Sequence, residues 1–304
     1  MITQILIQQT LIMFLLMLLG LLLSRLGMLT EQGSRDLSNI LLYAVIPCVV
    51  LRSYITAFSM EKLYALGFSA LLAVVAIAVA ILVSFFSFGM RDRIENFGAA
   101  FGNAGFIGIP LVTAVFGGEA AFYVVAFASL VNLMQWTYGI VIISGRRDTI
   151  NVKKIVLNPV FLSMLAGLVL FFTGVTLPVI VDQSLSLIAA SNTPLAMLVL
   201  GYYLSQIKLR ELFCGARLYA VVALRLLVIP LLTIAAFLPL PFARGEIAMI
   251  TLVAASTPVA TSTGMFAQKF GGDYRRAVAY ACASTVLSIP AIPLVILIAE
   301  HFLA

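Results

Sequence analysis

Two polar segments, rich in glycine and proline, lie inside long apolar stretches of this sequence. The first, residues 101–110, reads Phe-Gly-Asn-Ala-Gly-Phe-Ile-Gly-Ile-Pro. The second, residues 254–264, reads Ala-Ala-Ser-Thr-Pro-Val-Ala-Thr-Ser-Thr-Gly. Proline removes a backbone donor and glycine adds conformational freedom, so we expect both segments to interrupt a helix. The helix that restarts after each break would present unpaired N–H groups and a positive partial charge, which together favour binding of a carboxylate.

We expect the anion to bind where these two segments meet. Asn103 has an amide that both donates and accepts. Thr257 and Thr261 stand on either side of Pro258, four residues apart, and share one face if the local turn is helical. Polar residues in other apolar stretches fit a bond between two helices as well as contact with a substrate. The predicted substrate-binding residues are Asn103, Gly105, Pro110, Asn132, Gln135, Asn192, Arg225, Thr257, Pro258 and Thr261.

Arg225 needs separate treatment because a charged residue inside an apolar stretch marks a candidate site. No carboxylate lies at comparable depth to pair with it. Three roles stay open: bonding to backbone carbonyls, snorkelling toward the membrane surface, or contact with an anion. The first two are favoured over contact with substrate.

The composition is that of an integral membrane protein. Hydrophobic residues make up 63% of the 304 residues, charged residues 10%, and the mean hydropathy is +1.16. Such a chain has too little polar surface for a water-facing globule, so its outer surface must face lipid. We predict an all-α membrane protein with ten transmembrane helices, near 5–28, 37–55, 63–89, 97–116, 120–144, 155–177, 183–205, 215–237, 246–268 and 276–303.

The basic residues predict the orientation of these helices. Fourteen of the 18 lysines and arginines fall in the odd-numbered loops and three in the even-numbered loops, with Arg225 inside a helix. Positive residues favour the cytoplasmic side, so both termini should be extracytoplasmic. The first apolar run is too long for a signal-peptide core, so we expect it to be retained as a helix.

Two halves of five helices each indicate an inverted repeat. We predict a first repeat over 1–145, a cytoplasmic linker over 146–154 and a second repeat over 155–304. Pro47 and Pro194 are 147 residues apart, and Pro110 and Pro258 are 148 apart, in helices of equivalent number. The interrupted helices are then the fourth and the ninth, which we expect to cross at mid-membrane depth.

Several motifs resemble those of the auxin efflux carrier family. They are Asn103-Ala-Gly-Phe-Ile-Gly-Ile-Pro-Leu111, Ala255-Ser-Thr-Pro-Val-Ala260, Phe266-Ala-Gln-Lys-Phe-Gly-Gly-Asp273, Leu157-Asn-Pro159, and Arg225 with Pro230 five residues later. The similarity runs from the first helix to the last. It implies crossed interrupted helices, a scaffold part and a moving part of elevator type, in outline shared with bile-acid sodium symporters. The linker of about ten residues is similar to bacterial members of the family, which implies a bacterial inner (plasma) membrane and substrates such as malonate or malate.

These observations predict a secondary active transporter that moves a small organic anion, a carboxylate such as malonate, malate or an auxin-like acid, by alternating access. The alternatives are a sodium-coupled organic-anion symporter of the bile-acid type and, less favoured, a channel. The helices contain no deep Asp or Glu, which favours transport driven by the membrane potential. An enzyme is not expected, because no nucleophile–base pair, metal cluster or aspartate dyad is recognisable.

No cofactor and no metal are expected. Cys48, Cys214 and Cys282 are isolated, and the single His301 cannot build a zinc site. The basic residues form no stripe with interleaved aromatics, so nucleic acid is not expected as a partner. The expected partners are the organic anion and the lipid bilayer, and a homodimer is an assembly that stays open.

Overall fold

The computed structural model describes residues 2–146, 152–207, 215–270 and 272–303. Most of the predicted linker 146–154 and the basic residues Arg147, Lys208 and Arg210 therefore lie outside the described residues. Within the described part of the chain the secondary structure is helical, apart from one isolated β-bridge. Seven helices there are long and apolar enough to cross a membrane: Ile2–Arg25, Glu31–Ser53, Met60–Phe88, Gly118–Ser144, Val179–Ser205, Ala216–Phe237 and Tyr274–Leu303.

Three of these long helices are continuous α-helix or close to it: α1 (Ile2–Arg25), α4 (Met60–Phe88) and α18 (Tyr274–Leu303). A fourth consists of α11 (Val179–Ala190) and α12 (Asn192–Ser205), which meet at Ser191. The remaining three contain a π-helical turn, and their parts are α2 (Glu31–Ile40), η1 (Leu41–Val45) and α3 (Ile46–Ser53); η3 (Gly118–Ala120), α7 (Ala121–Met134), η4 (Gln135–Gly139) and α8 (Ile140–Ser144); and α14 (Ala216–Ala223), η6 (Leu224–Val228) and α15 (Ile229–Phe237).

Proline explains where most of the π-helical turns form. Pro47 and Pro230 are each the second residue of the α-helix that follows the π turn, as is Pro110 after a further π turn at Ala104–Gly108. Proline has no N–H to donate to the preceding turn, and widening that turn avoids the clash with its ring. The wider turn leaves backbone carbonyls without their helical partners, which makes them available to other side chains.

The shorter helices include the two interrupted ones. The first consists of α5 (Arg93–Ala100), η2 (Ala104–Gly108) and α6 (Ile109–Phe116), and the second of α16 (Glu246–Ala255) and α17 (Ser262–Phe270). The breaks fall inside the two polar segments, as their glycine and proline content predicts. The sixth predicted span is shorter than expected, because α9 (Val152–Val156) ends before α10 (Pro159–Thr173), which begins with Asn158 as its N-cap.

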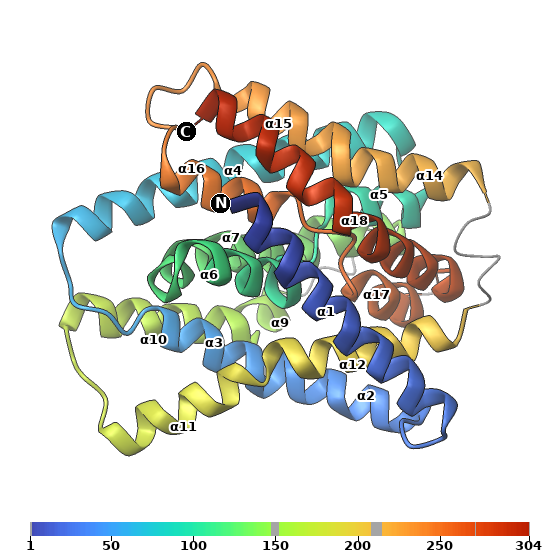
Figure 1. Cartoon of the computed structure of the whole chain (residues 1–304), viewed down its shortest axis with the longest axis horizontal. Coiled ribbons are helices and arrows are strands. Elements are labelled where there is room, and N and C mark those ends of the chain that lie inside the picture. Colours follow the sequence, from blue (N-terminus) through green and yellow to red (C-terminus); the bar gives the residue numbers. More distant parts are fainter. Residues whose placement is uncertain (1, 147–151, 208–214, 271, 304) are drawn as a thin grey trace.

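Helix α1 runs across the middle of the molecule and packs most extensively against α12 (Figure 1). The two backbones touch where glycines face each other: a Cβ on Gly201 would lie 2.1 Å from the carbonyl oxygen of Met17, and one on Gly20 would lie 2.5 Å from that of Leu198. Small residues at such crossings allow close helix packing in a membrane. In Figure 1 the turns after α3 and α10 lie at the left, and the turn between α1 and α2 lies at the right.

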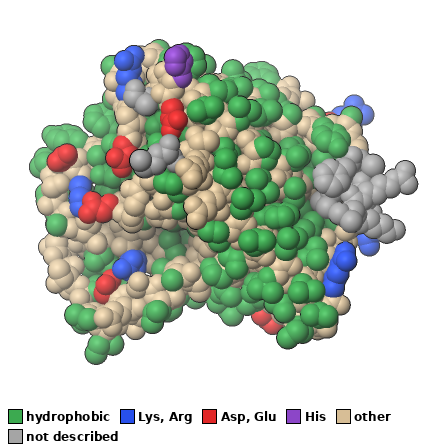
Figure 2. All heavy atoms as spheres, viewed as in Figure 1, with side chains coloured by type: hydrophobic (Ala, Val, Ile, Leu, Met, Phe, Trp, Pro, Cys, Tyr) green, Lys and Arg blue, Asp and Glu red, His purple; other side chains and the backbone are tan. Residues whose placement is uncertain are grey.

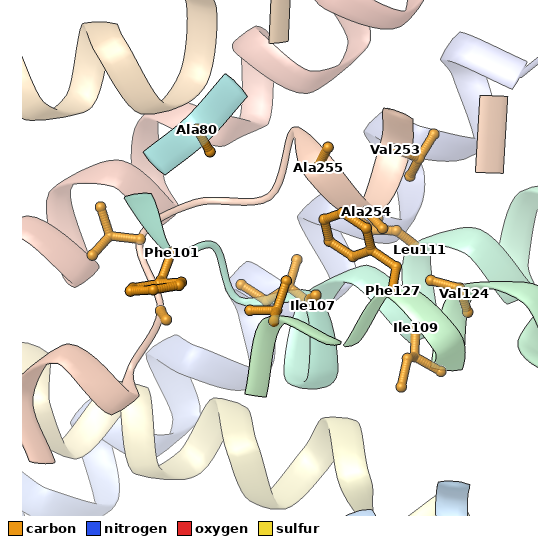
Figure 3. Close-up of a cluster of buried hydrophobic side chains, with 14 of the residues drawn as sticks. Ala80, Phe101, Ile107, Ile109, Leu111, Val124, Phe127, Val253, Ala254 and Ala255 are labelled. Atoms are coloured by element: carbon orange, nitrogen blue, oxygen red, sulfur yellow. The ribbon is translucent and has the colours of Figure 1, made fainter. Parts of the chain in front are cut away.

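A dense apolar core holds the interrupted helices from one side. Leu111, Val124, Phe127, Val253 and Ala254, from α6, α7 and α16, pack together in it (Figure 3). Each is buried, so this core fixes α6 and α16 against α7.

The outer surface is apolar across the middle of the molecule, and charged side chains gather mostly toward the left and right ends of the view in Figure 2. Large apolar side chains such as Phe86, Ile180 and Leu187 are more than three-quarters exposed, at 83%, 81% and 76%. An apolar belt with charged ends is the surface that a bilayer solvates. The chain is therefore a multi-pass membrane protein.

Candidate functional site

The two interruptions lie against each other. Gly102 and Val259 form an antiparallel bridge, in which the N–H of Asn103 donates to the carbonyl of Pro258 at 2.8 Å and the N–H of Ala260 donates to the carbonyl of Phe101 at 3.0 Å. These bonds pair the two extended segments and satisfy backbone groups that neither helix can satisfy.

Four helix ends meet around this bridge. In each interrupted helix, one piece ends before the break and the next begins after it. Helices α5 and α16 therefore bring their C-terminal ends to the breaks, and η2 and α17 bring their N-terminal ends. C-terminal ends carry a partial negative charge and N-terminal ends a partial positive charge. The crossing is therefore a set of opposed helix dipoles, whose balance depends on the side chains nearby.

Arg225, from η6, supplies the positive charge at the two C-terminal ends. Its guanidinium donates to the carbonyls of Thr257 at 2.9 Å, Ala99 and Ala100 at 3.4 Å each, and also Ala255. The residue is 2% exposed. Of the three roles that the sequence leaves open, the structure places Arg225 in the first, bonding to backbone carbonyls.

The side chain of Asn103 points to a different part of the crossing. It is 4% exposed, and its amide nitrogen has no hydrogen-bond partner among the residues that the structure describes. A buried donor without a partner costs about 1–3 kcal/mol, and this one is free to donate to an acceptor in the space beside it. Asn103 lines a cavity of about 70 Å³, which it shares with Gly105, Asn132, Gln135 and Thr261. None of the described residues that line this cavity is charged.

Two polar side chains of the Gly118–Ser144 helix connect this cavity to neighbouring helices. Gln135, from η4, accepts a hydrogen bond from Ser262 at the start of α17, at 3.0 Å. Asn132, from α7, accepts one from Asn158, the N-cap of α10, at 3.1 Å. Both residues therefore bridge helices, which is one of the two roles that the sequence leaves open, and both also line the small cavity.

A larger cavity of about 640 Å³ continues from the small one, because both are lined by Asn132, Trp136, Met265 and Phe266. Lys153 and Lys269 lie at the larger cavity, and the ammonium of Lys269 is 5.4 Å from the centre of the Trp136 ring. Two exposed lysines give this cavity a positive potential, which favours anions.

A third cavity, of about 880 Å³, is lined by Pro110 and Asn192, and it touches the crossing at Ile109. The amide nitrogen of Asn192 donates to the carbonyl of Gly105 at 3.0 Å. That carbonyl lies five residues before Pro110, which has no N–H to offer in the π turn, so Asn192 takes the place of the missing donor.

The structure thus places the ten predicted site residues in three groups. Five line the small cavity: Asn103, Gly105, Asn132, Gln135 and Thr261. Pro110 and Asn192 line the third cavity, of about 880 Å³. Thr257, Pro258 and Arg225 line none of these three cavities. Residues 256–261 are not helical, so the condition for Thr257 and Thr261 to share a face is not met, and the Thr257 hydroxyl donates to the carbonyl of Ala254 at 2.7 Å.

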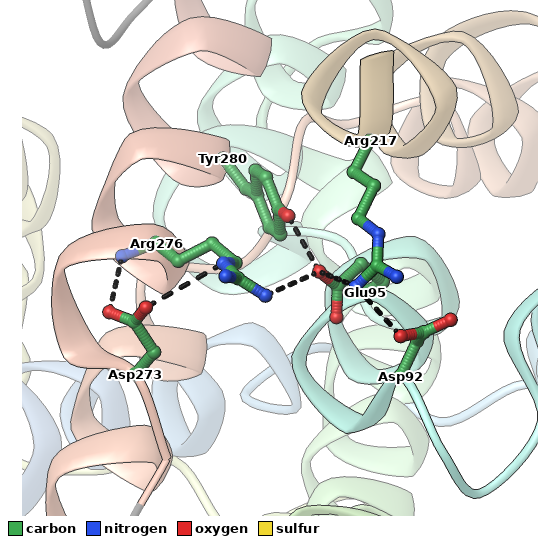
Figure 4. A network of polar contacts seen from close by, with 6 residues as sticks. All are labelled: Asp92, Glu95, Arg217, Asp273, Arg276 and Tyr280. Atoms are coloured by element: carbon green, nitrogen blue, oxygen red, sulfur yellow. Dashed lines mark hydrogen bonds and ion pairs between the residues drawn. The ribbon is translucent and has the colours of Figure 1, made fainter. Parts of the chain in front are cut away.

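A charged network lies at the beginning of α5, and the sequence did not reveal it (Figure 4). Glu95 is 2% exposed; it accepts hydrogen bonds from Arg276 at 3.1 Å and from the Tyr280 hydroxyl at 2.8 Å, and Arg217 lies 3.8 Å away. Arg217 also pairs with Asp92 at 2.8 Å. The network joins α5, α14 and α18. The only signal in the sequence is the spacing of Asp92 and Glu95 at a helix start, which does not indicate burial.

The fold and the crossing define a class: a polytopic membrane protein whose interrupted helices frame a small cavity is built as a transporter. A family model described as membrane transport protein matches residues 5–296. The chain belongs to this family, which confirms the resemblance to the auxin efflux carriers. It is also similar to an uncharacterized transporter from Methanothermobacter thermautotrophicus, with 27% identity over 296 residues, covering 92% of this chain and 93% of that protein.

Proposed function

We propose that this protein is a secondary active carrier of a small organic anion, a carboxylate such as malonate, malate or an auxin-like acid. The observation that carries the proposal is the amide nitrogen of Asn103, a buried donor without a partner that lines the cavity at the crossing. A carboxylate oxygen is a strong acceptor for such a donor.

The charges at the crossing support an anion. Arg225 compensates the negative ends of α5 and α16 with hydrogen bonds to their carbonyls. The positive ends of η2 and α17 then have no negative partner among the described residues that line the small cavity, since none of those is Asp or Glu. Helix N-termini of this kind bind anions without a nearby lysine.

The cavities support alternating access. The 640 Å³ cavity with Lys153 and Lys269 continues into the crossing, and the 880 Å³ cavity meets it at Ile109. We propose that the first is the cytoplasmic entrance and that the second becomes the extracytoplasmic one. In an elevator-type movement, the part that contains the crossing would slide against α2, α3, α10, α11 and α12.

We further propose ten transmembrane segments in two inverted repeats, 1–145 and 155–304. The ten segments are then the seven long helices, α10 and the two interrupted helices. The support is that both interruptions occur in the fourth segment of their half and pair with each other antiparallel. In this arrangement both termini are extracytoplasmic, and the short linker, which resembles that of bacterial members of the family, supports a bacterial inner membrane.

The topology makes a direct prediction. In a background without the three native cysteines, a cysteine in place of Arg275 should react with an impermeant maleimide only from the cytoplasmic side, and one in place of Arg244 only from outside. Both side chains are exposed, so the reagent can reach either. Labelling of intact cells and of inverted vesicles distinguishes the sides. Reaction of the Arg275 variant in intact cells would contradict the orientation.

The energy source makes another prediction. Uptake of labelled malate into proteoliposomes should rise when a potassium diffusion potential makes the interior positive and should fall when it makes the interior negative. The potential supplies about 2.3 kcal/mol per charge per 100 mV, and an anion moves toward the positive side. Replacing sodium by choline should leave uptake unchanged. Uptake that stops in choline would instead support the sodium-coupled alternative.

A further inference from the structure

Arg225 occupies a site made of carbonyl oxygens. Its guanidinium bonds the carbonyls of Ala99 and Ala100 at the end of α5, and those of Ala255 and Thr257 at and after the end of α16. Of the ion pairs found among the described residues, none includes Arg225. The charge is therefore balanced by backbone dipoles and not by a carboxylate.

The charge of the guanidinium nearly equals the partial charge of the two helix ends that it contacts. The C-terminal end of a helix carries about half a negative charge, so two converging ends carry about one, which a single guanidinium matches. Converging carbonyl oxygens are also the ligands that a hard cation such as sodium prefers. In transporters with interrupted helices, such carbonyls and C-terminal ends are where a coupling ion can bind.

We propose that Arg225 is a tethered cation that fills the position of a coupling ion, so that the crossing is held together without any free cation. The positive charge of the Arg225 guanidinium thereby stays at the crossing through the whole transport cycle. A coupling ion would have to bind and leave, whereas a guanidinium attached to η6 stays. The consequence for coupling rests on the proposed transport function, but the presence of a cation site can be tested without any substrate.

The space around the guanidinium fits this role. Gly102 faces it so closely that a Cβ there would lie 2.2 Å from one of its nitrogens and 2.8 Å from its central carbon. The site is therefore shaped to the guanidinium, and removal of the side chain leaves a polar cavity lined by carbonyl oxygens. Such a cavity should accept a guanidinium ion from solution.

The experiment is chemical rescue of Arg225→Ala, followed by the thermal melting temperature of the purified protein in detergent. Guanidinium and methylguanidinium are added up to about 10 mM, far below denaturing concentrations, which are molar. Urea, which is similar in shape but neutral, is the matched control. We expect the variant to melt below wild type, guanidinium to restore at least half of the loss with a saturable dose response, and urea to restore none. Wild type should not respond to any of them.

Rescue by urea as effective as rescue by guanidinium, or no rescue at all, would overturn the proposal. Two further variants decide the matter if Arg225→Ala cannot be purified. Arg225→Lys keeps a charge and Arg225→Met keeps a similar apolar length, so the lysine variant should melt clearly above the methionine variant. Equal melting temperatures would show that the charge is not needed. Because no substrate is present, these outcomes are independent of whether a carboxylate binds.

Discussion

Replacing Asn103 by alanine should weaken carboxylate binding about ten- to a hundredfold and leave the protein folded. The loss of one hydrogen bond to a charged group costs about 1.5–3 kcal/mol, which gives that range in affinity. The fold should tolerate the change, because the amide nitrogen of Asn103 bonds to none of the described residues, while its backbone remains paired with Pro258 and helix η2. Binding can be measured by thermal shift of the purified protein against malonate, malate and indole-3-acetate.

Two further variants make this test specific. Asn103→Asp has nearly the same shape but places a negative charge in the cavity, so it should reduce binding more than alanine does. Asn132→Ala should matter less, because Asn132 already accepts a hydrogen bond from Asn158. If Asn103→Ala binds all three acids as wild type does, the carboxylate does not lie at the crossing.

Much of the fold follows from patterns that the sequence carries openly. Long apolar runs predict membrane helices because a helix satisfies its own backbone groups in lipid, and the seven long helices lie within a few residues of predicted runs. The interruptions follow from the glycines and prolines of 101–110 and 254–264. Both kinds of inference depend on local chemistry, which a single segment displays by itself.

The arrangement of the site depends on contacts between distant segments, and these the sequence shows poorly. Thr257 and Thr261 would share one face only in a helical turn, but the backbone between them is not helical, and of the two only Thr261 lines the small cavity. For Arg225, the absence of a nearby carboxylate in the sequence favours bonding to backbone carbonyls, but which carbonyls these are follows only from the structure.

Glu95 shows a second reason why the sequence alone does not reveal such contacts. In the sequence it is an acid near the end of an apolar run, which usually lies at the membrane surface. In the structure Arg276, Arg217 and Tyr280 surround it, and they come from helices more than 100 residues later. Burial of a charge depends on its partners, and no local pattern names a partner so far along the chain.

Replacing Gly102 by alanine should be among the most harmful single changes in this protein. The added methyl group would lie 2.2 Å from a guanidinium nitrogen of Arg225 and 2.6 Å from the hydroxyl oxygen of Thr257. The guanidinium is buried and bonded to carbonyls on both interrupted helices, so it cannot move aside without breaking those bonds. Overpacking costs about 1–3 kcal/mol, and each lost bond to a charged group costs about 1.5–3 kcal/mol. We expect a loss of stability of about 3 kcal/mol or more, and loss of transport.

The matched control is Gly98→Ala in α5, where the nearest side-chain atoms to an added Cβ are 3.5 Å away, an ordinary contact. That change should be neutral or slightly stabilising, because alanine favours a helix over glycine by about 1 kcal/mol. A double-mutant cycle then assigns the cause. In the Arg225→Ala background, Gly102→Ala should cost much less than in wild type, because the methyl group enters space that the guanidinium has left. Equal costs in the two backgrounds would show that Gly102 is needed for the backbone of the crossing and not for the room it gives Arg225.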